Sequence, residues 1–204
     1  MFTLCACGNK SEEATIVGEW TAKLDMWEIT EKMQGSYIGE MDQDLFNAMK
    51  KLYAGISAKL TFTFDENGEG SMTLGMADTM EGLIKNAKKN PSILEDYMRA
   101  MPASSDMTEE DFKAYNGMSV AEYVEDLISS NQLSEVLGEA EDTEATLDYT
   151  LNGNKLTLTV DGEDEIFTIK LDGDKMIFED YEGSAGLSDD INAVLFEGLT
   201  FKRK

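Results

Sequence analysis

The sequence predicts a mainly β protein of the α+β class. Its core is an eight-stranded antiparallel up-and-down barrel, with helices inserted between strands 1 and 2 and between strands 3 and 4. Eight segments alternate apolar and polar residues with a period of two, as half-buried strands do. Asn-Gly and Asp-Gly pairs between several of these segments favour tight hairpins. Two longer stretches instead space apolar residues by three and four, as amphipathic helices do.

The alternating segments give the strands in order. In the first three strands the shared face consists of Ile16, Gly18, Trp20, Ala22, Leu24 and Met26, then Ala58, Leu60, Phe62 and Phe64, then Met72 and Leu74. In the last five it consists of Leu147, Tyr149 and Leu151, then Leu156, Leu158 and Val160, then Phe167, Ile169 and Leu171, then Met176 and Phe178, and finally Leu195, Leu199, Phe201 and Arg203. The run Met176-Ile177-Phe178 makes the seventh strand apolar on both faces. Polar turns at 65–70, 152–153, 161–165 and 172–174 separate neighbouring strands. Eight strands joined in this way are enough to close a barrel and remove its sheet edges.

The two helical stretches are expected at 38–53 and 77–140. Within the second, Pro91 is expected to open one helix, and Thr108 and Ser119 to act as N-caps of two more. The outward positions of most strands are Lys, Thr, Ser or Asp, which offer an apolar helix face little to bury against. We therefore expect the helices to form a small bundle over one mouth or flank of the barrel.

The composition excludes several classes of function. Among 204 residues there are 17 Lys and Arg, 41 Asp and Glu and no His, so the formal net charge is −24. Such a charge repels phosphate backbones, and we expect no nucleic-acid partner. Without His, and without Cys beyond residue 7, the chain lacks the usual nucleophile–base pairs and the usual zinc ligands. We expect no enzyme, no cofactor and no metal, and carboxylate-based catalysis is the less favoured alternative.

The spacing of the carboxylates at 65–70 partly matches that of a calcium-binding loop. Asp65 and Glu69 occupy the first and fifth positions of such a loop, but Met76 stands where the twelfth position requires a bidentate Glu. Met72 and Leu74 also continue a strand, whereas the loop must lead into a helix. We interpret the segment as a hairpin turn.

The two cysteines of the chain, Cys5 and Cys7, lie within its first seven residues. Leu4-Cys5-Ala6-Cys7 resembles the end of a bacterial lipoprotein signal, in which an aliphatic residue and two small residues precede an acylated Cys. The resemblance implies lipid attachment at Cys7, with residues 1–15 as a truncated signal and polar tether. Two or three acyl chains anchor a protein stably to a membrane. We therefore expect an extracytoplasmic, lipid-anchored protein of the bacterial cell envelope that meets the membrane through this anchor only.

Gly18-Glu19-Trp20, at the start of the first strand, resembles the Gly-x-Trp signature of lipocalins. In that family the Trp packs at the closed end of the barrel, beneath a basic residue from the last strand, and Arg203 matches that residue. The resemblance implies a lipocalin-like, calycin-type domain over 16–204, with Trp20 and Arg203 as a structural plug. The helical insertion at 77–143 departs from the family pattern.

The resemblance also implies a non-catalytic protein that binds a small apolar ligand. The candidate ligand-binding residues are Phe62, Phe64, Tyr149, Met80 and Leu83, where the mouth of the barrel would meet the helices. Because the predicted interior positions are bulky, we expect a mostly filled barrel with any pocket confined to that mouth. The alternative is an envelope or surface module that binds an unidentified protein and uses its filled barrel as a scaffold.

Overall fold

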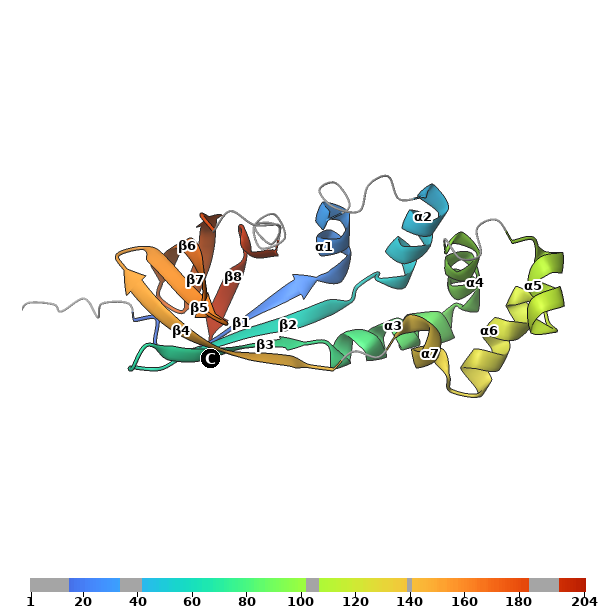
Figure 1. Ribbon diagram of the computed structural model, residues 1–204, viewed down its shortest axis with the longest axis horizontal. Coiled ribbons are helices and arrows are strands. Elements are labelled where there is room, and N and C mark those ends of the chain that lie inside the picture. Colours follow the sequence, from blue (N-terminus) through green and yellow to red (C-terminus); the bar gives the residue numbers. More distant parts are fainter. Residues whose placement is uncertain (1–14, 34–41, 102–106, 139–140, 184–194) are drawn as a thin grey trace, which may run out of the picture.

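The computed structural model describes residues 15–33, 42–101, 107–138, 141–183 and 195–204. Its strands are β1 (Gly18–Asp25), β2 (Ser57–Phe64), β3 (Glu69–Gly75), β4 (Thr143–Asn152), β5 (Lys155–Val160), β6 (Glu163–Asp172), β7 (Lys175–Tyr181) and β8 (Thr200–Arg203). Its helices are α1 (Met26–Met33), α2 (Gln43–Leu52), α3 (Ala77–Lys89), α4 (Pro91–Ala100), α5 (Glu109–Asn116), α6 (Val120–Ser129) and α7 (Leu133–Leu137). Figure 1 shows the strands gathered in one part of an extended molecule and most of the helices in the other.

The strands form a closed antiparallel barrel, which confirms the predicted fold class. Each strand pairs with its neighbours in the sequence, and β8 pairs with β1 to complete the ring. The two insertions also lie where they were predicted, α1 and α2 between β1 and β2, and α3 to α7 between β3 and β4. The hairpin between β5 and β6 has two central residues with positive φ, Asp161 at 52° and Gly162 at 84°. This is the backbone that a two-residue type I′ turn requires.

Several strand boundaries differ from the prediction. The last strand, β8, begins only at Thr200, so Leu195 and Leu199 precede it. The first strand ends before Met26, which begins α1, because the carboxylate of Asp25 accepts the backbone N–H groups of Trp27 and Glu28, both at 3.0 Å, and so caps a helix. The short helix α1 was not predicted. The acidic segment 161–165 is not all turn, because β6 already begins at Glu163.

The two predicted helical stretches are confirmed, and the structure divides the second of them into separate helices. The stretch expected at 38–53 contains α2, whose N-cap is Asp42, while 38–41 lie outside the described residues. The stretch expected at 77–140 contains α3 to α7. The predicted starts at Pro91, Thr108 and Ser119 are confirmed, the latter two as capping boxes.

The barrel is filled by the inward faces of its strands. Its largest side chains with less than 2 % exposure are Trp20, Phe62, Phe64, Phe167, Phe178, Phe201, Leu156, Ile169 and Met176. The Phe rings contact one another across the interior: Phe62 lies 5.3 Å from Phe201 and 6.0 Å from Phe178, measured between ring centroids. The predicted bulky interior therefore leaves little internal space.

One end of the barrel is closed by Trp20 and Arg203. The guanidinium of Arg203 lies 4.7 Å from the centre of the Trp20 ring, within range of a cation–π interaction. Nη2 of Arg203 donates to the backbone carbonyls of Thr15 and, at 2.7 Å, Val17. The indole N–H of Trp20 donates to the carbonyl of Ile16 at 2.6 Å. The chain leading into β1 is thus held against the last strand.

The helices have a hydrophobic core of their own. Its buried members are Leu52, Ile56, Leu83, Ala87, Leu94, Phe112, Val120, Val124, Leu127 and Leu133. Met26, at the start of α1, packs against both this core and that of the barrel. Figure 1 shows α3 to α7 beyond the ends of β2 and β3, so they extend the molecule along these strands and do not lie across the barrel.

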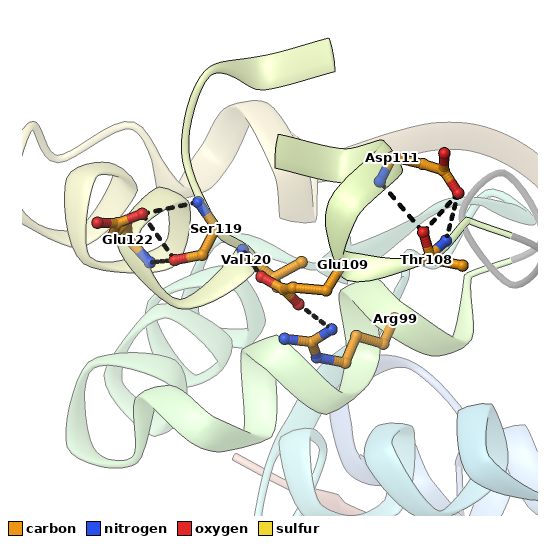
Figure 2. A network of polar contacts seen from close by, with 7 residues as sticks. All are labelled: Arg99, Thr108, Glu109, Asp111, Ser119, Val120 and Glu122. Carbon is orange, nitrogen blue, oxygen red and sulfur yellow. Dashed lines mark hydrogen bonds and ion pairs between the residues drawn. The ribbon is translucent and has the colours of Figure 1, made fainter. Parts of the chain in front are cut away.

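Figure 2 shows how polar groups fix α4, α5 and α6 relative to one another. Glu109, in the first turn of α5, accepts the backbone N–H of Val120 at 2.9 Å and pairs with Arg99 of α4. The Val120 hydrogen bond, followed by Arg99, holds the pKa of Glu109 below its ordinary value. In the two capping boxes, Thr108 lowers the pKa of Asp111 and Ser119 that of Glu122 through hydrogen bonds to the carboxylates.

Candidate functional site

Among the described residues, an apolar cavity in the barrel is the candidate binding site. The lining residues are Phe62, Met72, Leu147, Leu158, Val160, Glu165, Phe167 and Phe196. The cavity has a volume of about 190 Å³. Seven of these eight side chains are apolar, and they come from β2 to β6 and from the short segment before β8.

The cavity lies toward the end of the barrel that carries the helices. In an up-and-down barrel the β1–β2, β3–β4 and β5–β6 connections share one end, and the first two of these connections hold the helices. Val160 and Glu165 flank the β5–β6 turn, so they lie near this end. The plug of Trp20 and Arg203 belongs to the opposite end, because Arg203 pairs with Trp20 near the start of β1. None of the described lining residues belongs to α1 to α7, and Phe62 pairs with Trp20 across β1 and β2, so the pocket expected at a helix-capped mouth stays a prediction.

Three Phe rings form an aromatic wall in the cavity. Phe167 and Phe196 have ring centroids 5.2 Å apart in an edge-to-face arrangement, and Phe62 lies 6.2 Å from Phe196. Behind them Phe178 contacts all three, at 4.9 Å from Phe167 and 5.7 Å from Phe196. Rings packed on both sides have few alternative rotamers, so this wall is rigid.

One polar group faces the cavity. Glu165 stands on β6 opposite Leu158 of β5 and shares the inward face with the buried Phe167. The hydroxyl of Tyr181, on the neighbouring strand β7, donates a hydrogen bond to its Oε2. The other oxygen, Oε1, accepts no hydrogen bond within the described part of the chain. A half-buried carboxylate therefore lies at an otherwise apolar site.

The barrel residues predicted to bind ligand lie close together, but only one of them reaches the cavity. Phe62 lines it. Phe64 stacks on Phe62 at 5.6 Å, and Tyr149 meets Phe64 edge-on at 4.8 Å, farther along the barrel. The Tyr149 hydroxyl donates to the backbone carbonyl of Asp65, and burial followed by the charge of Asp65 raises the pKa of Tyr149. These two side chains thus support the wall of the site.

Met80 and Leu83 are placed elsewhere. Both lie on α3 and pack in the helical core, where Leu83 is 4 % exposed. The five predicted residues are therefore divided between two cores and do not form one pocket.

Sequence reasoning missed the residues that give this cavity its character. Leu147, Leu158 and Phe167 were expected inside the barrel, but Glu165 was assigned to the turn at 161–165, and Tyr181 and Phe196 were not considered. A signal was available for Glu165, because a two-residue spacing relates it to Phe167 and so predicts an inward side chain. A carboxylate at an inward strand position is unusual unless it has a partner.

A second hollow lies between α2 and α4 and is larger, about 470 Å³. Its lining is Asp42, Asp44, Asn47, Ala48, Lys51, Asp96, Arg99 and Ala100. Its cations are already partnered, since Lys51 lies 3.1 Å from Asp96 and Arg99 pairs with Glu109. Because six of its eight described lining residues are charged or polar, the barrel cavity is the better candidate for an apolar ligand.

Cys5 and Cys7 fall outside the described residues. Within the described ranges, no helix is both long and apolar enough to span a bilayer, and no cluster of three or more Cys, Asp or Glu side chains could hold a metal ion. Comparisons with family models, with curated proteins and with solved structures returned no match.

Proposed function

We propose that this chain is a non-catalytic, lipocalin-like binding protein that holds a small apolar ligand in the barrel cavity. The observation that carries the proposal is the cavity itself, seven of whose eight lining side chains are apolar. Apolar concave sites on a rigid scaffold are the common form of small-molecule sites. The nearly filled interior explains why the ligand must be small.

The volume limits the size of the ligand. An engineered apolar cavity of about 150 Å³ binds benzene, whereas sites for drug-sized ligands are about 300–1,000 Å³. At about 190 Å³, the cavity suits a molecule with one ring or a short branched chain. A long acyl chain would not be enclosed.

The binding proposal is tested by NMR titration of methyl-labelled protein with toluene and benzyl alcohol. We expect saturable shifts at the methyls of Leu147 and Leu158, while Leu94 in the helical core stays unchanged. Val160→Phe places a ring in the cavity from its rim and should abolish the shifts. Ile177→Phe is the matched control, because Ile177 alternates with two buried residues of β7 and so points outward. If neither compound produces saturable shifts, the binding proposal fails.

Lipid anchoring is the second part of the proposal and rests on Leu4-Cys5-Ala6-Cys7. The anchor would place the barrel outside the cytoplasmic membrane, in the bacterial cell envelope. Detergent phase partitioning of protein taken from its native cells tests this part. We expect the protein in the detergent phase, and the Cys7→Ser variant in the aqueous phase, with Cys5→Ser as the control that stays in detergent. A native protein found wholly in the aqueous phase would refute anchoring.

The alternative function is a protein-interaction module with the barrel as scaffold. The packed Phe cluster of the barrel favours it, because a filled interior serves stability. The same titration separates the two functions: a barrel that takes up neither probe would leave the scaffold as the better account.

A further inference from the structure

We propose that the barrel cavity selects small apolar amines, held as cations by Glu165. This inference rests on the proposed ligand-binding function and specifies the chemistry of the ligand. The observation behind it is a single carboxylate among seven apolar side chains.

The position of the carboxylate is fixed by its neighbours. Glu165 pairs with Leu158 across the β5–β6 ladder, close to a tight two-residue turn that limits movement of the strand. The hydroxyl of Tyr181, on β7, donates a hydrogen bond to Oε2 and so fixes the orientation of the carboxylate. Oε1 has no hydrogen-bond donor among the described residues and is available to a ligand.

The surroundings favour a positive partner for this group. A carboxylate beside apolar surface loses solvation, and a cation that forms a charge-assisted hydrogen bond restores the lost interaction. No Lys or Arg is among the described residues that line the cavity. The faces of Phe62, Phe167 and Phe196 add cation–π attraction at short range. The net charge of −24 concentrates cations around the whole molecule.

The same features argue against other ligands. A carboxylic acid would enter as an anion and meet Glu165 with like charge. A divalent metal ion requires several oxygen ligands, and the described residues of the cavity lining provide one carboxylate. A neutral hydrocarbon fits the apolar wall but leaves Oε1 without a partner.

The test uses four probes of one shape: toluene, benzyl alcohol, benzylamine and benzoate. Each is titrated at neutral pH against the methyl resonances of Leu147 and Leu158. We expect benzylamine to bind about ten-fold or more tightly than benzyl alcohol, the ratio that one charge-assisted hydrogen bond provides. Benzoate should bind more weakly than toluene.

The variant Glu165→Gln keeps the shape and removes the charge. It should reduce the preference for benzylamine over benzyl alcohol to less than about two-fold, while the affinity for toluene is retained. Glu163→Gln is the matched control, because it removes the same charge from an exposed position on the same strand and should retain the full preference. The preference for benzylamine over benzyl alcohol is measured on the unmodified protein. It therefore tests the inference even if Glu165→Gln destabilises the fold.

The outcomes separate the two proposals. If toluene and benzyl alcohol bind and benzylamine has no advantage, the amine inference is overturned while the proposed ligand-binding function stands. If a preference for benzylamine survives in Glu165→Gln, the carboxylate is not its cause and the inference is again overturned. If no probe binds, the proposed function itself fails.

Discussion

We expect the barrel and the helices, which have separate hydrophobic cores, to unfold in separate transitions. The substitution Leu94→Ala tests this expectation. Leu94 of α4 is fully buried in the helical core. Removing three carbons loses about 2.5 kcal/mol of transfer free energy. The space that remains after partial collapse adds about 1 kcal/mol, for a total of about 3.5 kcal/mol. Among the described residues no buried side chain belongs to both cores, so we expect this loss to fall on the helices alone.

The assay uses Trp27→Phe as background, which leaves Trp20 as the only Trp of the chain. Trp20 is buried in the barrel, so its fluorescence reports the barrel, while circular dichroism at 222 nm reports mainly the helices. With urea slopes of about 1–3 kcal/mol/M, Leu94→Ala should lower the urea midpoint of the helical signal by about 1.2–3.5 M. The urea midpoint of the Trp20 fluorescence should not change. A joint shift of both signals would show that the chain unfolds as one cooperative unit and would refute the reasoning.

Three further predictions concern single side chains. Gly70→Ala should destabilise the barrel by about 2 kcal/mol or more in urea unfolding, because its Cβ would lie 2.3 Å from the Thr63 carbonyl, whereas Gly75→Ala, with 3.4 Å to its nearest atom, should cost less. Arg203→Met removes two charge-assisted hydrogen bonds to backbone carbonyls and should lower the free energy of unfolding by about 2–3 kcal/mol, so an unchanged midpoint would contradict the role of the plug. The depressed pKa of Glu109 contributes stability that is fully present above its ordinary value of 4.5 and is lost as the pH falls through the folded value. Glu109→Gln should therefore weaken the acid dependence of the helical signal, and an identical pH profile would count against this.

The barrel could be predicted because its signals are local. Alternation along β2 from Ala58 to Phe64 needs only the sequence of one strand, and the turn at Asp161-Gly162 is specified by two residues. The helix starts at Thr108 and Ser119 were predictable for the same reason, since a cap and its partner are three residues apart. Helix α1 could not be separated from β1, because eight residues hold too few turns for a clear period.

The candidate site was predicted less well because it depends on tertiary contacts. Met80 and Phe62 both lie on apolar faces, and nothing in their local patterns assigns them to different cores. Glu165 lies in a run of acidic residues, and such a run is typical of an exposed turn, so its inward position was not predicted. Its partner Tyr181 is 16 residues away, and the register of β6 and β7 that brings them together includes an irregularity after Thr168.

The topology explains why the helices and the cavity occur at the same end of the barrel. In an up-and-down barrel every connection from an odd strand to the next even strand lies at one end, and both helical insertions are connections of this kind. Two insertions that leave from neighbouring hairpins at one end can share a core, as α2 and α4 do. The opposite end is closed by Trp20 and Arg203, with tight hairpins at Gly153 and Gly173. Because Trp20 and Arg203 close that end, we infer that a ligand of the cavity would enter from the end of the helical insertions, where Val160 lines the cavity next to the β5–β6 turn.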